Sequence, residues 1–379
     1  MAEPFKNLIH RGTVEACGHH LERAWPAFDR PRFERLAMHG LEALEMKARA
    51  MHIADALEAT LPRDFDHAAG VIEAALGPPV PLDAGVTSGD ADGRGLAGWI
   101  VWPLGELVSR AGIDHPERAL ACLHALTQRL TAEFAIRRFV AQRPEVTFAT
   151  LRQWVRDPSA HVRRLVSEGS RPRLPWGLQL KALIADPTPT LPLLEALQDD
   201  ASEYVRRSVA NHLNDIAKDH PELIVAWLER WLPNAGPERR ALLRHACRSL
   251  IKSGHPQVLA HWGAGAALRG DATLRVAPGL ITVGGSLDLE LTLRSRARSA
   301  QALVIDYVVH HVKADGRLTP KVFKGWTVEL APGATLRLAK RHSMRAVTTR
   351  RYHAGRHGLD VQVNGRVVAS AGFDLRLAP

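Results

Sequence analysis

Few cysteines and no long apolar runs characterise this sequence. Its three cysteines, among 379 residues, lie far apart and each falls within a helical pattern, so we expect reduced thiols and no disulfide framework. No uncharged apolar stretch approaches the roughly 20 residues that cross a bilayer, and residues 1–10 lack the apolar centre of a signal peptide. The zinc-site spacings HExxH and CxxC and a phosphate-binding glycine loop are missing as well. These absences predict a cytosolic protein with no membrane segment, metal or cofactor.

The charge balance is uneven along the chain. The 50 Lys and Arg residues exceed the 40 Asp and Glu residues by ten. Residues 267–379 hold 18 basic and 8 acidic side chains, while residues 1–266 hold 32 of each, so the whole excess is C-terminal. Because a net positive field attracts anions, the composition favours a polyanionic partner. The same boundary separates helical periodicity from strand-like alternation, which predicts two domains of different class.

Helical periodicity dominates residues 1–262. Helix-sized segments follow one another with short breaks, for example Arg32–Leu57, Pro116–Arg129, Glu133–Ala141 and Glu222–Trp231, and no strand pattern lies between them. The insert Gly77–Gly95 is rich in Pro, Gly and Asp, and we expect it to form an exposed loop.

A repeat lies within this helical part. The sequence DPSAHVRR at 157–164 recurs 43 residues later as DASEYVRR, at the period of HEAT-type helical hairpins. Each copy has an Asp six residues before an Arg, and a serine two residues after the Asp that is expected to cap the helix. A weaker third copy spans Pro237–Leu250. We therefore predict an all-α, HEAT-like repeat solenoid over residues 1–262.

Strand-like alternation follows a short, flexible linker at 263–270. Turn residues such as Asn364-Gly365 separate the segments, and Tyr352, eight residues before Asp360, is typical of the tyrosine corner of immunoglobulin-like domains. The pattern predicts an all-β, immunoglobulin-like sandwich over residues 271–379. Its expected strands are Thr273–Val276, Ser286–Arg294, Ala302–Val312, Trp326–Leu330, Thr335–Ala339, Gly358–Val363 and Val367–Leu375.

Three polar segments carry a family resemblance: LTAEFAIRRF, SEGSRPRLPW and RRSVANHLNDIAKDHP. They resemble the AlkC-type DNA alkylation repair glycosylases, HEAT-like repeat enzymes related to AlkD in which the solenoid precedes an immunoglobulin-like domain. The resemblance implies hydrolysis of the N-glycosidic bond of cationic N3-alkylated bases, chiefly 3-methyladenine and also 3-methylcytosine, without metal or cofactor. Glu133, Glu168 and Asp215 match the family's acidic positions, and Trp176 would be an aromatic wall for the damaged nucleotide.

Carboxylates suit this chemistry for a physical reason. Alkylation of a ring nitrogen makes the base cationic and a good leaving group, so the enzyme mainly has to stabilise a developing oxocarbenium ion and place a water molecule. If each of two carboxylates lowered the barrier by about 3 kcal/mol, the rate would rise roughly 10⁴-fold. None of the five lysines before residue 267 adjoins the proposed acids in a pattern that suggests a Schiff-base nucleophile. A monofunctional glycosylase is expected.

Each proposed site residue also has a plainer interpretation. Glu133 lies four residues before Arg137, which is the geometry of an exposed helical ion pair. Glu168 would then end its helix toward solvent, Asp215 would lie on a solvated helix face, and Trp176 would be a packing residue.

The arginines divide into two groups. Arg163 and Arg206, six residues after their aspartates, are expected to pair within the solenoid. A DNA-contacting stripe on the concave surface is predicted for Arg152, Arg156, Arg164, Arg171, Arg173, Arg207, Asn211 and Asn214. A second DNA clamp in the sandwich is predicted for Lys340, Arg341, Arg345, Arg350, Arg351 and Arg356, with a solubilising charge cluster as the alternative.

These expectations describe a monomer that binds double-stranded DNA containing alkylated bases, associates with the nucleoid and begins base excision repair. The alternative is a HEAT-repeat module without chemistry that binds damaged DNA or serves as a protein scaffold. DNA binding without base release would favour that alternative.

Overall fold

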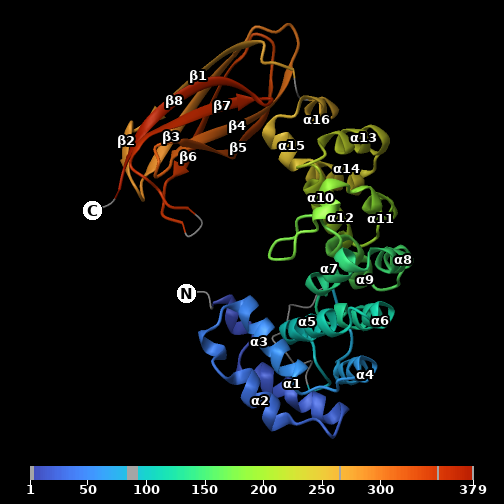
Figure 1. The fold of residues 1–379 in the computed structure, drawn as a ribbon. Coiled ribbons are helices and arrows are strands. Elements are labelled where there is room, and N and C mark those ends of the chain that lie inside the picture. The colour runs from blue at the N-terminus through green and yellow to red at the C-terminus, as the bar shows by residue number, and fades with distance from the viewer. Residues whose placement is uncertain (1–3, 83–92, 264–265, 348–349, 378–379) are drawn as a thin grey trace. The chain divides into compact units, whose positions relative to one another are not determined.

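A computed structural model describes residues 4–82, 93–263, 266–347 and 350–377. The chain forms two compact units, one made of residues 1–219 with 236–246 and the other of residues 220–235 with 247–379. Helices make up the first unit, and sheets with a few helices make up the second (Figure 1). The two predicted fold classes are confirmed, in the predicted order. No helix in the described parts of the chain is both long and apolar enough to span a bilayer.

The first unit is a succession of short helices that pack on their sequence neighbours. Helix α9 packs against α7 on one side and α12 on the other, and α12 packs against α14. Its α-helices are α1 Arg11–Ala24, α2 Arg30–Met38, α3 Met46–Glu58, α4 Phe65–Ala75, α5 Val101–Ala111, α6 Pro116–Thr127, α7 Glu133–Gln142, α8 Pro144–Trp154, α9 Ala160–Gly169, α10 Lys181–Ala185, α11 Leu191–Leu197, α12 Glu203–Ile216 and α14 Pro237–Ala246.

Two expected features of this unit differ from the structure. The segment Arg32–Leu57 holds two α-helices, because Gly40 adopts φ 68° and ends α2 before α3 begins at Met46. Of the insert Gly77–Gly95, residues 83–92 lie outside the described residues. Its ends are held together, since Leu76 and Leu96 form a parallel bridge.

The aspartates and arginines of the predicted repeat form contacts both within one copy and between the two copies. Arg163 donates to both carboxylate oxygens of Asp200, at 2.6 and 3.0 Å, and to the carbonyl of Asp157 at 2.8 Å. Arg206 likewise donates to the carbonyl of Asp200 at 2.6 Å. The predicted pairing within each copy therefore uses backbone oxygens, while the carboxylate–guanidinium pair joins one copy to the next.

The serines take the predicted N-cap positions without capping through their side chains, and each aspartate closes a turn just before its helix. Ser159 and Ser202 occupy the N-cap positions of α9 and α12, but neither side chain makes a capping bond. Instead, the backbone N–H of each serine donates to the aspartate two residues earlier, Asp157 or Asp200, at 2.8 Å. This short Asp-centred turn fixes the start of each helix.

Two sheets and three helices make up the described part of the second unit. The sheets have strand orders β1-β3-β6 and β2-β8-β7-β4-β5. Its helices are α13 Pro221–Trp231, α15 Arg248–Ser253 and α16 Pro256–His261, and its strands are β1 Gly270–Ala277, β2 Leu280–Thr282, β3 Ser286–Ser295, β4 Gln301–Val312, β5 Leu318–Leu330, β6 Thr335–Ser343, β7 Gly355–Val363 and β8 Arg366–Arg376.

Alternation along these strands places one face of each sheet in a shared apolar core. Leu287, Leu291, Ile305, Leu359 and Phe373 are all fully buried or nearly so. The hairpin signal at Asn364-Gly365 is confirmed, since both residues adopt positive φ between β7 and β8.

Three details of the sandwich differ from expectation. The three-residue strand β2 is too short to show alternation, and β5 begins at Leu318, well before the predicted Trp326. The Tyr352 ring lies against His311 with centroids 5.7 Å apart, and no backbone acceptor for its hydroxyl occurs among the described residues, as a tyrosine corner would require.

The predicted linker coincides with the change from helix to strand. Helix α16 ends at His261 and β1 begins at Gly270, with residues 264–265 outside the described part. The division into compact units falls earlier, because α13, α15 and α16 group with the sheets.

Candidate active site

Three helices of the first unit bring the three predicted acids together. Glu133 is the first residue of α7, Glu168 the penultimate residue of α9 and Asp215 the penultimate residue of α12. We call these three carboxylates the acid cluster. They lie 35 and 47 positions apart along the chain, and the packing of α9 between α7 and α12 joins them.

Two arginines link the acid cluster into a chain of alternating charge. Arg164 donates to Glu133 and lies 3.5 Å from Glu168. Arg171 donates to Glu168 at 2.5 Å and to Asp215 at 2.8 Å. Helical spacing explains part of this arrangement, because Arg164 and Arg171 lie four residues before and three residues after Glu168.

Hydroxyl and ammonium groups complete the hydrogen bonds of the acid cluster. Ser208 donates to Glu168 at 2.6 Å and Thr131 donates to Glu133 at 2.8 Å. Lys218 donates to Asp215 at 2.8 Å. One of the five lysines that precede residue 267 therefore does lie beside a proposed acid. Every carboxylate in the cluster thus has at least two donors.

Burial decides between the interpretations of these acids. The side chains of Glu133, Glu168 and Asp215 are 12, 6 and 2 % exposed, respectively. A solvent-facing helix end for Glu168 and a solvated face for Asp215 are therefore wrong. The ion pair between Glu133 and Arg137 is wrong too, because Glu133 pairs with Arg164 and Arg137 is fully buried.

The arginines keep the central carboxylate ionised. Burial alone would raise the pKa of Glu168, but Arg164, Arg171 and the Ser208 hydroxyl outweigh it, and its pKa lies below the ordinary value of 4.5. Burial likewise acts to lower the pKa of Arg171, and Glu168 and Asp215 raise it above the ordinary value. At neutral pH Glu168 is therefore a charged carboxylate in a largely water-free setting, where its interactions are stronger than in water.

A neighbouring tyrosine was missed by the sequence analysis. Tyr204, in the first turn of α12, is 39 % exposed, and the Arg164 guanidinium lies 5.1 Å from its ring centre. The repeat contained a signal for it, because Tyr204 and His161 occupy the same place in the two copies and their rings lie 5.8 Å apart.

Trp176 lies on the irregular segment between α9 and α10. Its side chain is 61 % exposed, so it is not a core packing residue, although its ring contacts that of Phe5 edge-on with centroids 6.0 Å apart. Its backbone adopts φ 63°, which is strained for a large side chain, and its carbonyl accepts a hydrogen bond from Lys47 at 3.2 Å. Figure 1 shows this segment in light green as a loop beside α10.

Comparisons with known proteins agree with this architecture. Residues 129–250 match a family model described as DNA alkylation repair enzyme, and residues 271–377 match the C-terminal Ig-like domain of the uncharacterised protein YhaZ. The chain is 34 % identical to the uncharacterized protein YhaZ of Bacillus subtilis over 98 % of this chain and 99 % of that protein. It is 36 % identical to the Pseudomonas fluorescens alkylpurine DNA glycosylase AlkC, solved with DNA that contains an abasic site analogue. The two structures superpose with a TM-score of 0.87 over 99 % of this chain and 100 % of that one. The chain belongs to the AlkC family of DNA alkylation repair enzymes.

In this AlkC-family chain, several residues expected in a DNA-contacting stripe face other partners. Arg164 and Arg171 are engaged by the acid cluster, which corrects their placement on an open surface. Arg173 pairs with Asp219 at 2.8 Å. Asn214 is 4 % exposed, and its burial conflicts with a DNA contact.

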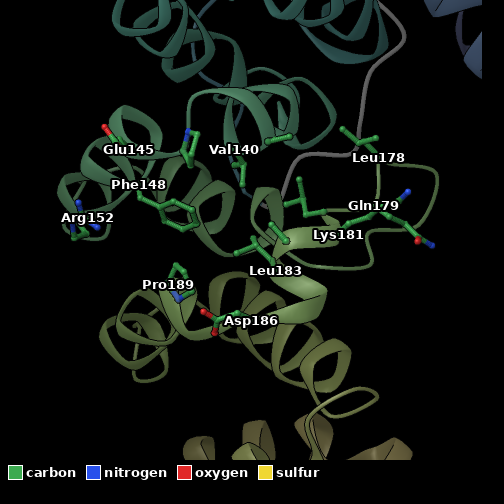
Figure 2. A pocket seen from close by; sticks show the side chains of 14 residues that line it. Val140, Glu145, Phe148, Arg152, Leu178, Gln179, Lys181, Leu183, Asp186 and Pro189 are labelled. Carbon is green, nitrogen blue, oxygen red and sulfur yellow. The ribbon is translucent and has the colours of Figure 1, made fainter.

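Other predicted DNA contacts remain accessible. Arg152, Arg156 and Arg207 are exposed, and Asn211 is partly exposed and lies 3.0 Å from the His245 ring nitrogen. Arg152 lines a pocket of about 850 Å³ between the α7–α8 hairpin and the α10 region. In Figure 2 the side chain of Arg152 lies at one edge of this pocket, while that of Phe148 points into it. DNA contacts by these side chains stay a prediction.

The basic residues of the AlkC-family sandwich are partly engaged. Lys340 donates to the Lys324 carbonyl at 2.8 Å, and Arg350 lies 2.8 Å from the ring nitrogen of His311. Arg341 and Arg356 are exposed and pair with Asp288 and Asp374, respectively. Arg345 and Arg351 are exposed on the connection between β6 and β7, of which residues 348–349 lie outside the described part. The second clamp stays a prediction.

The AlkC-family structure offers no metal centre within its described residues. No group of three or more His, Cys, Asp or Glu side chains there has an arrangement that would hold a metal ion. His212, which is buried beside the acid cluster, has its pKa lowered to about 4 by burial, and its Nδ1 donates to the Ser167 carbonyl at 2.9 Å. It is therefore a neutral, structural histidine at pH 7.

Proposed function

We propose that this AlkC-family chain is a monofunctional DNA glycosylase. It hydrolyses the N-glycosidic bond of cationic N3-alkylated bases, 3-methyladenine and 3-methylcytosine, in duplex DNA. The observation that supports the proposal most directly is the meeting of Glu133, Glu168 and Asp215 in one arginine-linked cluster on neighbouring helices. The Pseudomonas fluorescens relative is an alkylpurine DNA glycosylase, which supports the reaction class.

The reaction depends more on electrostatic stabilisation of the transition state than on proton transfer to the base. The alkylated base leaves as a neutral molecule once its bond to C1′ breaks, and positive charge develops on the sugar. Fixed carboxylates stabilise that charge, and one of them orients the water that attacks C1′. Glu133 is the most accessible of the three, at 12 % exposure, and is therefore the carboxylate best placed to contact the sugar or the water.

The arginines have a supporting role in this proposal. Arg171 is buried and touches two carboxylates, so it sets the distance between Glu168 and Asp215. Trp176 projects from the segment that carries Arg171, and its exposed ring is available to stack on the damaged nucleotide. DNA binding itself is assigned to Arg152, Arg156 and Arg207, which are exposed, and to the basic sandwich residues.

Base release from defined DNA tests the proposal. Duplexes that contain 3-methyladenine or 3-methylcytosine are incubated with wild type and with Glu133→Gln, Glu168→Gln and Asp215→Asn. Each variant is expected to lose about 100-fold or more in single-turnover rate while it still binds DNA, since one such carboxylate contributes about 3 kcal/mol. Glu203→Gln is the matched control, because Glu203 lies on α12 like Asp215 but is exposed at its first turn.

Two outcomes would contradict the proposal. Undiminished release by all three variants would remove the acid cluster from the mechanism. Salt-sensitive DNA binding by the wild type with no release of either base would favour the module without chemistry.

A further inference from the structure

Arg137, in the middle of α7, is the largest fully buried side chain of the described structure. Its guanidinium donates to four backbone carbonyls: Leu178 at 2.6 Å, Gly169 at 3.0 Å, Arg171 at 2.6 Å and Pro172 at 3.4 Å. The planar fork of an arginine is suited to such multiple acceptors, whereas a lysine ammonium can donate to at most three.

All four carbonyls belong to the 169–178 segment, which joins the end of α9 to the region before α10. This segment carries Arg171, which links Glu168 to Asp215, and Trp176. Beyond Gly169, the last residue of α9, the segment has no helix or strand, so its backbone carbonyls need partners from elsewhere. Arg137 donates to these carbonyls, as backbone N–H groups would in a helix or a sheet.

Burial of this guanidinium has an electrostatic cost. No carboxylate lies within ion-pair distance of Arg137 among the described residues, and burial together with the nearby Arg171 lowers its pKa to about 10. A buried cation without a direct counter-ion is expensive, and an apolar side chain of similar size would avoid that cost only by leaving the four carbonyls without this donor. The acid cluster partly compensates, since Glu133, Asp215 and Glu168 favour the charged form from further away.

Neighbouring residues are adapted to the contact. A side chain at Gly177 would place its Cβ 3.2 Å from Arg137 Nε and 2.9 Å from a Leu174 methyl group, so glycine leaves room for the guanidinium. On the opposite side of the loop, Lys47 donates to the Trp176 carbonyl at 3.2 Å. The segment is thus fastened at several points along its backbone.

We propose that Arg137 is a positioning residue for base release. By fixing the backbone of the 169–178 segment, it holds Arg171 between Glu168 and Asp215 and holds the Trp176 ring in its exposed orientation. Arg137 itself does not touch the substrate. This inference rests on the proposed glycosylase function. It states that the rate of base release depends in part on a fully buried side chain that is not one of the acids.

Single-turnover base release by the full-length chain, with enzyme in saturating excess over DNA, tests the inference. The rate constant at saturating enzyme reports the geometry of the site, and circular dichroism with thermal unfolding reports separately whether the variant is folded. Arg137→Met is expected to lower the rate constant at least 100-fold with DNA affinity within threefold of wild type. Arg137→Lys is expected to recover part of the rate. Arg138→Met is the matched control, since Arg138 is the next residue of α7 and is 40 % exposed.

Each result then decides a separate point. A wild type that releases no base defeats the proposed function itself. A wild-type rate constant in Arg137→Met, whether or not the variant is less stable, overturns the positioning role and leaves Arg137 a structural residue. If Arg137→Met does not fold, Arg137→Lys decides the question, since a wild-type rate constant in that variant overturns the inference and a lowered rate constant in the folded variant supports it.

Discussion

Asp200 is expected to be among the most sensitive positions in the helical unit. Its carboxylate is 5 % exposed, accepts two hydrogen bonds from Arg163 of the preceding repeat, and accepts the Ser202 N–H in the turn that precedes α12. Because α9 carries Glu168 and α12 carries Asp215, the pair of Asp200 and Arg163 also ties together two helices of the acid cluster.

The cost of removing this carboxylate follows from those contacts. Loss of the hydrogen bond from the Ser202 N–H destabilises by about 1 kcal/mol, and loss of a mostly buried, charge-assisted pair adds about 2 kcal/mol. Asp200→Ala should therefore lower the free energy of unfolding by about 3 kcal/mol, or Tm by roughly 6–12 °C for a unit of this size. Asp200→Asn keeps an oxygen acceptor for the Ser202 N–H and should cost about 2 kcal/mol.

Calorimetry of the full chain measures these shifts, and a double-mutant cycle with Arg163→Met isolates the pair. We expect a coupling energy of at least about 1 kcal/mol. Burial acts to raise the pKa of Asp200, but the opposing effect of Arg163 and the Ser202 amide is larger, and the pKa lies below its ordinary value of 3.8. The contribution is therefore fully present above about pH 4 and lost as pH falls through the lowered pKa. A cost below about 1 kcal/mol for Asp200→Ala, or strictly additive effects, would refute the reasoning.

Three further predictions concern protonation and nucleophilicity. Burial, reinforced by Arg350, lowers the pKa of His311 to about 3 and that of His342 to about 4. Since the unfolded chain binds protons at these sites below about pH 6.5, stability should fall between pH 6.5 and 4 by up to about 1.4 kcal/mol per pH unit for each histidine. Urea unfolding at pH 7 and pH 5 measures this loss of stability. His342→Phe removes one of the two histidines, so an equal loss of stability between the two pH values in that variant would contradict the reasoning. Because its arginines lower the pKa of Glu168 against the effect of burial, protonation of this carboxylate should not slow base release until the pH drops below about 4.5. A pH–rate profile of Glu133→Gln, which lacks the Glu133 carboxyl group, checks this. A loss of rate that begins at higher pH would contradict it. The Nζ atom of Lys218 lies 2.8 Å from Asp215 and is engaged in that ion pair, so we do not expect it to attack the sugar. Borohydride should therefore trap no enzyme–DNA adduct, and a trapped adduct that Lys218→Met abolishes would instead show lyase chemistry.

Sequence patterns predicted the elements whose signal is periodic. The 43-residue repeat located α9 and α12, and alternation located most strands of the sandwich, because burial of one face imposes those periods. The three-residue β2 has too few positions to alternate. The 169–178 segment has no period at all, since its backbone is organised by Arg137, a residue more than 30 positions earlier in the chain.

The acids and the arginines of the site show where prediction from sequence stops. A glutamate or aspartate side chain is short, so the helix position of Glu133, Glu168 or Asp215 nearly fixes where its charge lies. An arginine has a long, flexible stem, and its helix position leaves open whether the guanidinium points to solvent or folds back onto a carboxylate. Arg164 has carboxylates within reach in the three-dimensional structure but only Glu168 near it in sequence. Pairing with a buried carboxylate satisfies charges that would otherwise be desolvated alone, so such an arginine is drawn inward wherever acids converge. Once acids are expected to meet at a site, the arginines within four residues of them are therefore better assigned to that site than to a DNA backbone.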